Sequence, residues 1–337
     1  MKILDWKEDI NKDELDLVNK CLSNGKLVIF PTETVYGIGA DARNSKSVDD
    51  IFIAKGRAND NPLIVHLGNK EDISKYAIIQ NEVEEKLINA FMPGPFTIIL
   101  KKKEIIPNNV SAGLDTVGIR IPSNKIANTI LSTSNIPVAA PSANVSGKPS
   151  GTNINDIINE FDNKVDYIID GGNTDIGLES TVVKVIDGVP SILRPGFITK
   201  DDILDVIGQV KVDDNLFKKV TGPVESPGMK YKHYAPSSKC TLIYIKDKEE
   251  LVNYFKEKST SDTVIIGSSL LKDIKCKKFL YYGDTLPEIS HNIFTLLRQA
   301  DTYKPSEILI EGVSKDGLGL AIMNRLIRAS SYNYVER

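Results

Sequence analysis

Residues 31–66 read PTETVYGIGADARNSKSVDDIFIAKGRANDNPLIVH, and this stretch decides the predicted fold. The apolar run at 27–30 comes directly before it and predicts a buried strand that ends at Pro31. Polar residues and glycines follow at once, among them Thr34. Because open α/β sheets usually bind ligands where a strand ends, we expect a binding site at this edge.

The second half of the stretch predicts a short helix and then another strand. Ser47 and Asp50 resemble a capping box for a helix from about Val48 to Gly56. A second apolar run follows and is interrupted by a histidine. We expect these elements to bring five polar side chains to one edge: Thr34, Lys55, Arg57, Asn61 and His66. Taken alone, a solvated helix end beside a buried histidine explains the stretch equally well.

Two later apolar segments also end in polar residues. Residues 117–121 alternate like a strand, with Arg120 opposite the apolar positions, so a surface arginine is an alternative. Residues 137–140 lead into PSANVSG, and Thr152 is expected to cap the next helix. Small residues let a ligand approach the backbone, and their hydroxyl and N–H groups suit phosphate oxygens.

Residues 179–194 predict a hairpin with its turn at Asp187-Gly188. Ser180 opens the first arm, Arg194 closes the second, and a helix is expected from about Thr199. We expect this first domain to cover residues 1–212.

Residues 213–237 contain Gly-Pro, Pro-Gly and Ala-Pro pairs and show no periodicity, as in a linker. They also hold MKYKHY at 229–234, which is more aromatic than a passive linker. Since a lid laid over a ligand would bury these aromatic rings, we expect the segment to be a lid as well as a linker.

Residues 238–337 alternate between predicted strands and helices and indicate a smaller Rossmann-like domain with a parallel sheet. Neither a Gly-x-Gly-x-x-Gly motif nor a Walker A motif occurs in it. The sequence of this domain alone therefore predicts no phosphate loop.

Composition excludes several classes of protein. The 337 residues include 42 Lys and Arg and 45 Asp and Glu, so the net charge of −3 disfavours strong direct binding to nucleic acid. The 3 cysteines form no Cys-x-x-Cys motif, so we expect no disulfide framework, no zinc knuckle and a cytoplasmic location. No apolar run approaches the ~20 residues of a membrane span, so no membrane partner is expected.

The polar residues at the strand ends are cationic, hydroxylic and amide side chains. Such a set suits a polyphosphate and a carboxylate better than a metal cage. No Gly-x-Ser-x-Gly motif occurs, which disfavours a serine hydrolase. Glu33 and Asp41 are candidate carboxylates without a paired acid–base signature. The residues thus predict a site for a phosphorylated or carboxylated small ligand.

Several motifs in one order give a more specific indication. FPTETVYGIGADA, Lys-Gly-Arg at 55–57, NPLIVH at 61–66, GIRIP at 118–122 and PSAN at 141–144 together resemble the YrdC-like family. SPGMKYKHYAP at 226–236 and the second domain resemble its long form. The resemblance covers essentially the whole chain. It implies an α/β fold with a twisted open mixed sheet and flanking helices, plus the Rossmann-like domain. Ala58 stands where the family often has proline, which affects only the local loop.

The resemblance implies a nucleotidyltransferase reaction, in which L-threonine, bicarbonate and ATP give threonylcarbamoyl-AMP, pyrophosphate and water. The product would pass to a tRNA threonylcarbamoyl transferase complex, which modifies the adenosine beside the anticodon. Mg²⁺ would be held by phosphates and water, and no protein metal site is expected.

The resemblance also implies roles for individual residues. Those expected to bind L-threonine are Thr34, His66, Arg120, Ala140 and Ser180. Those expected to bind ATP are Arg57, Asn61, Thr116, Ser142, Ser150, Arg194 and Tyr234. Those expected to be catalytic are Lys55, Arg57, Ser142 and Asn144.

Two other functions remain open from the sequence. An RNA-binding module acting on tRNA or rRNA would use exposed aromatic residues, whereas the basic positions here lie beside Ser, Thr and Asn. Carbamoyl transfer in hydrogenase maturation would need zinc-finger and acylphosphatase-like parts, which we do not find in the sequence.

Overall fold

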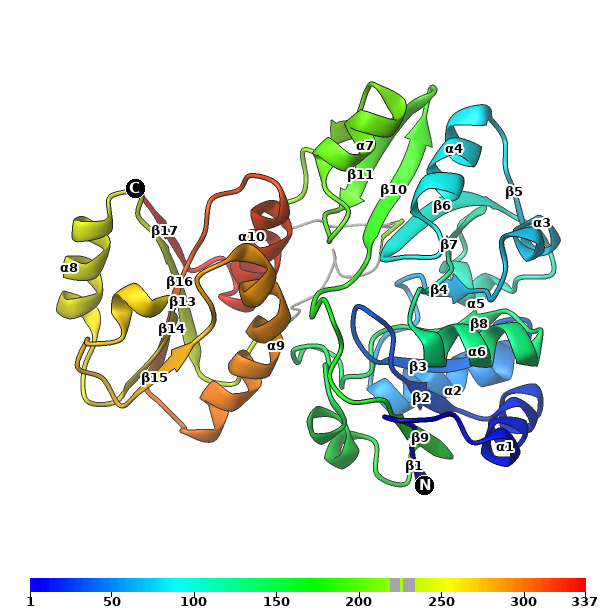
Figure 1. Cartoon of the computed structure of the whole chain (residues 1–337), viewed down its shortest axis with the longest axis horizontal. Helices are drawn as coiled ribbons and strands as arrows, with labels where there is room; N and C mark the ends of the chain where they lie inside the picture. Colours follow the sequence, from blue (N-terminus) through cyan, green and yellow to red (C-terminus); the bar gives the residue numbers. More distant parts are fainter. Residues whose placement is uncertain (219–224, 227–233) are drawn as a thin grey trace.

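The computed structural model describes residues 1–218, 225–226 and 234–337. These residues form two separate sheets (Figure 1), a mixed 12-stranded sheet and a 5-stranded sheet whose pairings are all parallel. This confirms the predicted α/β fold class, with a twisted mixed sheet and a smaller parallel one. The predicted boundaries at 212 and 238 remain expectations. Of the predicted linker and lid at 213–237, the structure describes residues 213–218, 225–226 and 234–237.

The large sheet contains strands that come from distant parts of the chain. Its order is β1 (Lys2–Asp5), β9 (Tyr167–Asp170), β2 (Val28–Phe30), β3 (Gly37–Asp41), β8 (Val138–Ala139), β4 (Ile64–His66), β7 (Thr116–Arg120), β6 (Phe96–Lys102), β10 (Thr181–Ile186), β11 (Val189–Arg194) and β12 (Lys211–Val212), with β5 (Ala77–Ile78) on β6. The predicted hairpin is present as β10 and β11, which pair antiparallel.

Helices cover both faces of this sheet and bury a separate core on each. On one face lie α1 (Lys12–Ser23) and α6 (Lys125–Ser134), and on the other lie α2 (Ser45–Lys55), α4 (Glu82–Phe91) and α7 (Lys200–Ile207). The short helices α3 (Ile73–Tyr76) and α5 (Asn108–Ser111) also pack on the second face. In β2, Ile29 packs into one core, whereas Val28 and Phe30 pack into the other, as expected for a strand buried on both faces.

The small sheet has the order β15 (Lys278–Tyr281), β14 (Thr263–Gly267), β16 (Glu307–Glu311), β13 (Lys239–Tyr244) and β17 (Tyr334–Glu336). Helix α8 (Lys248–Lys258) packs on one face, and α9 (Leu286–Thr302) and α10 (Leu318–Ala329) pack on the other. Figure 1 shows α9 and α10 on the side that faces the larger sheet. Val35, Leu178 and Tyr234 join the apolar cluster formed with α9 and α10, so the two parts share buried side chains.

Local details differ from the predictions. Helix α2 begins at Ser45, because the side chain of Asn44, rather than Ser47, accepts from the first backbone N–H groups. Thr152 does not cap a helix; Asn153 caps a single 3₁₀ turn, Ile154–Asp156.

Strand β3 was not predicted. It begins immediately after the polar loop and contains two glycines. A Cβ atom on Gly39 would lie 2.7 Å from atoms of both Phe30 and Val138, so only glycine permits this spacing of β2, β3 and β8.

Candidate active site

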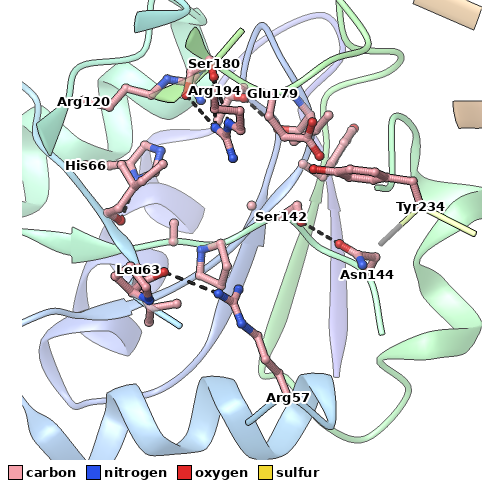
Figure 2. A pocket seen from close by; sticks show the side chains of 18 residues that line it. Arg57, Leu63, His66, Arg120, Ser142, Asn144, Glu179, Ser180, Arg194 and Tyr234 are labelled. Atoms are coloured by element: carbon pink, nitrogen blue, oxygen red, sulfur yellow. Dashed lines mark hydrogen bonds between the residues drawn. The ribbon is translucent and has the colours of Figure 1, made fainter. Parts of the chain in front are cut away.

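The predicted edge is where one pocket forms, at the ends of β4, β7 and β11 and beside the loop that follows β8 (Figure 2). The residues that line it are Thr32, Val35, Tyr36, Gly37, Arg57, Pro62, Leu63, Ile64, His66, Arg120, Ala140, Pro141, Ser142, Asn144, Glu179, Ser180, Arg194 and Tyr234. Their side chains leave a cavity of about 60 Å³. Ligand pockets usually measure roughly 300–1,000 Å³, so a ligand of ordinary size requires side chains to move.

Arg120 supplies one fixed positive charge to the pocket. It ends β7, where it pairs in parallel register with His66 at the end of β4. Its guanidinium lies 2.9 Å from Oε1 of Glu33, and both side chains are buried. The buried carboxylate behind Arg120 keeps the cation in place and oriented toward the pocket. The surface alternative for Arg120 is therefore wrong.

His66 is a neutral side chain in this site. Burial, together with the nearby charge of Arg120, lowers the pKa of its imidazole to about 3. Nδ1 lies 3.2 Å from the carbonyl oxygen of Ile64 and donates to it in the tautomer that carries the proton on Nδ1. A neutral imidazole can orient a substrate without adding charge.

Arg194 and Ser180 form a second polar group. The Arg194 guanidinium donates from Nε and Nη2 to the Ser180 carbonyl oxygen, at 3.1 and 3.0 Å, and from Nη2 to the Ser180 hydroxyl at 3.1 Å. Burial lowers the pKa of Arg194 to about 10, so the side chain remains charged at neutral pH. The backbone carbonyl of Ser180 thus holds the guanidinium of Arg194 in place.

Lys55 organises the loop after β8 from behind. Its ammonium donates to the carbonyl oxygens of Ser142 and, at 2.7 Å, of Asn144. The Ser142 hydroxyl donates to Asn144 Oδ1 at 2.6 Å. Burial, reinforced by Arg57, lowers the pKa of Lys55 well below its ordinary value. Lys55 therefore shapes this wall of the pocket but does not line it.

The family model Sua5/YciO/YrdC, described as "Telomere recombination", matches residues 20–196, more than half of the chain. The chain belongs to this family. A second model, "Threonylcarbamoyl-AMP synthase, C-terminal domain", matches residues 198–331.

The similarity to known proteins extends over nearly the full length of this Sua5/YciO/YrdC family member. The threonylcarbamoyl-AMP synthases of Pyrococcus abyssi and Bacillus subtilis are 42% and 38% identical, over 99% and 98% of both chains. The crystal structure of P. abyssi Sua5 complexed with L-threonine is 41% identical, with a TM-score of 0.93 and complete coverage of both chains. E. coli YciO, at 21% identity and a TM-score of 0.52, covers 58% of this chain and shows the shared fold.

The structure brings together most of the residues that the family resemblance implied. Those that line the pocket are Arg57, His66, Arg120, Ala140, Ser142, Asn144, Ser180, Arg194 and Tyr234. Tyr234 comes from the end of the predicted lid. It is buried and stacks on Phe294 of α9, with ring centroids 5.1 Å apart.

Other predicted residues lie behind the lining. The Thr34 hydroxyl lies 2.7 Å from that of Thr32, which does line the pocket. The Ser150 hydroxyl donates to Oε1 of Glu179 at 2.6 Å. Asn61 is fully buried, and neither polar atom of its side chain has a hydrogen-bond partner. Since such an amide is costly to bury, Asn61 marks a place where a ligand or water can donate and accept.

Thr116 does not reach the pocket. It begins β7, whereas Arg120 ends it, and four residues of strand span about 13 Å. Its hydroxyl donates to Oε1 of Glu225 at 3.3 Å. Thr116 therefore does not line this pocket, and its role in binding ATP stays a prediction.

Sequence reasoning missed Glu179 and Thr32 as lining residues. The sequence predicts Glu179 only as the start of a hairpin, because nothing in Glu-Ser-Thr distinguishes an inward carboxylate from a surface one. The described residues contain no group of three or more His, Cys, Asp or Glu side chains that could hold a metal. Within the same residues, no helix has the length and apolar character needed to cross a bilayer.

Proposed function

We propose that this chain is a threonylcarbamoyl-AMP synthase, a nucleotidyltransferase that uses L-threonine, bicarbonate and ATP. One observation carries the proposal: a single pocket is lined by Arg120 and His66, which suit a carboxylate, and by Arg57 and Ser142, which suit phosphate. The full-length similarity to proteins of that name supports it.

The chemistry fits these side chains. The threonine amine attacks CO₂ and loses a proton, or attacks bicarbonate with release of water, and in both cases gives a carbamate. A carbamate oxygen then attacks the α-phosphorus of ATP, and the bond to the bridging oxygen of pyrophosphate breaks. Such a transfer depends on positioning and charge neutralisation rather than on a covalent nucleophile. In this proposal Arg120 binds the threonine carboxylate, while Arg57 and Arg194 neutralise phosphate charge.

Mg²⁺ would neutralise phosphate charge during the transfer. The donors around the pocket fit a metal held mainly by phosphate oxygens and water, because its lining carboxylate, Glu179, is already paired with Arg325. We further propose that the product passes to a tRNA-modifying transferase in the cytoplasm.

The first prediction concerns substrate dependence. Pyrophosphate release should require ATP, L-threonine and bicarbonate together, because the carbamate is the nucleophile that displaces pyrophosphate. A coupled phosphate assay with each substrate omitted in turn measures this, with L-serine as the matched control for the threonine methyl group. Equal release without threonine would exclude the synthase, and tight tRNA binding without any release would favour the RNA-binding alternative.

A further inference from the structure

Helices α9 and α10 lie on the side of the second part that faces the larger sheet (Figure 1), and an arginine of each contacts a loop of the first part. Arg298 of α9 donates to the backbone oxygens of Asp156 and Pro149 and pairs with Glu160 at 2.8 Å. Pro149 directly precedes Ser150. Arg325 of α10 reaches further, to a residue that lines the pocket.

Arg325 is completely buried and makes an ion pair across the boundary between the two parts. Its Nε donates to Oε2 of Glu179 at 2.9 Å, and its Nη1 donates to the Pro195 carbonyl oxygen at 2.8 Å. The other carboxylate oxygen of Glu179 accepts from Ser150 at 2.6 Å. One carboxylate therefore links α10 to two neighbouring loops of the pocket.

Glu179 presents an electrostatic difficulty for a polyphosphate site. Its carboxylate lines the same pocket as Arg57 and Ser142, and a bare negative charge there would repel a triphosphate (Figure 2). The charges that face Glu179 are Arg325 from α10, Arg194 from β11 and, less directly, Lys55 from the end of α2. Among these charged groups, Arg325 contacts a carboxylate oxygen of Glu179 directly. The other carboxylate oxygen accepts from the uncharged Ser150 hydroxyl.

We infer that Arg325 is a positioning residue for ATP binding: it neutralises Glu179 and holds the Ser150 loop and the Glu179–Ser180 loop together. The second domain thereby completes the nucleotide site in the first. The inference rests on the proposed function, since it takes ATP as the ligand of the pocket. It gives the second domain a specific task, which the sequence did not reveal.

The decisive variant is Arg325→Met, which keeps the apolar stem and removes the charge. We expect ATP affinity, measured by calorimetric titration of the full chain, to fall about tenfold or more, because a charge-assisted pair is lost and Glu179 is left negative. Affinity for L-threonine should fall by a smaller factor than affinity for ATP, because Arg120 and His66 lie on other strands and, of the expected threonine residues, Ser180 belongs to the loop that Arg325 holds. Arg337→Met is the matched control, since Arg337 makes an exposed pair with Glu250 within the second part.

A second variant tests whether Arg325 acts on ATP binding through the charge of Glu179 or only stabilises the fold. Glu179→Gln/Arg325→Met removes both charges and keeps an acceptor for Ser150, so much of the lost ATP affinity should return. The part that does not return measures the loss of the contacts by which Arg325 holds the loops. In the parent chain, burial raises the pKa of Glu179 and the charge of Arg325 opposes that effect. The pKa of Glu179 should therefore rise in Arg325→Met, where this charge is absent. ATP affinity should then improve as the pH falls from about 8 to about 6, and the parent chain should show no such gain.

Several results would overturn the inference. These are ATP affinity unchanged in Arg325→Met, equal losses for ATP and threonine, or no recovery in the double variant. If Arg325→Met alone does not fold, the double variant decides: weak ATP binding by that folded protein contradicts the inference. Because binding is measured without turnover, failure of pyrophosphate release in the parent chain would refute the proposed function and leave this comparison valid.

Discussion

Arg120→Ala and Arg57→Ala should impair different substrates. Arg120→Ala is expected to weaken L-threonine binding by about tenfold to a hundredfold, because a charge-assisted hydrogen bond to a carboxylate is worth about 1.5–3 kcal/mol. Arg57→Ala should weaken ATP binding by a similar factor, because Arg57 lines the wall beside Ser142. Calorimetric titration of each variant with each substrate measures both effects.

Removal of Arg120 also has a cost for folding, which requires a control. Glu33 would remain buried beside an empty position, and breaking a buried pair costs about 3–5 kcal/mol. The double variant Glu33→Gln/Arg120→Met removes both charges and should recover much of that stability, while threonine binding stays weak. Equal defects toward both substrates in Arg57→Ala and Arg120→Ala would contradict the assignment of the two corners.

Lys55→Met should reduce turnover by about a hundredfold, although Lys55 does not line the pocket. The ammonium holds two backbone carbonyls of the Ser142–Asn144 loop, and without it these oxygens would be buried without their donor. We also expect a loss of about 1–3 kcal/mol in the free energy of unfolding.

The matched control for this prediction is Lys46→Met. Lys46 lies in the first turn of α2, exposed to solvent, so its loss should change neither turnover nor stability measurably. Pyrophosphate release and urea denaturation together test the pair. Full activity in a folded Lys55→Met protein would show that the loop keeps its shape without the lysine.

The sequence determined the fold class and the edge that holds the site. Apolar runs that stop at Pro31 and Pro141 predicted buried strands with polar ends, and the motif order identified the family. Local signals worked where the physics is local, as in the Asp187-Gly188 turn and the capping box at Thr199. The helix caps at Asn44 and Asn153 were missed because neighbouring Ser and Thr residues are equally good caps by type.

Only the tertiary structure decided which polar residues meet. Thr116 and Arg120 belong to one strand, yet strand length keeps the first away from the pocket. Glu33 and Arg120 form a buried pair across 87 positions of sequence, and Glu179 and Arg325 do so across 146. A carboxylate has no local pattern that shows whether it faces solvent or a buried arginine, since burial and charge pairing arise only when distant elements pack together.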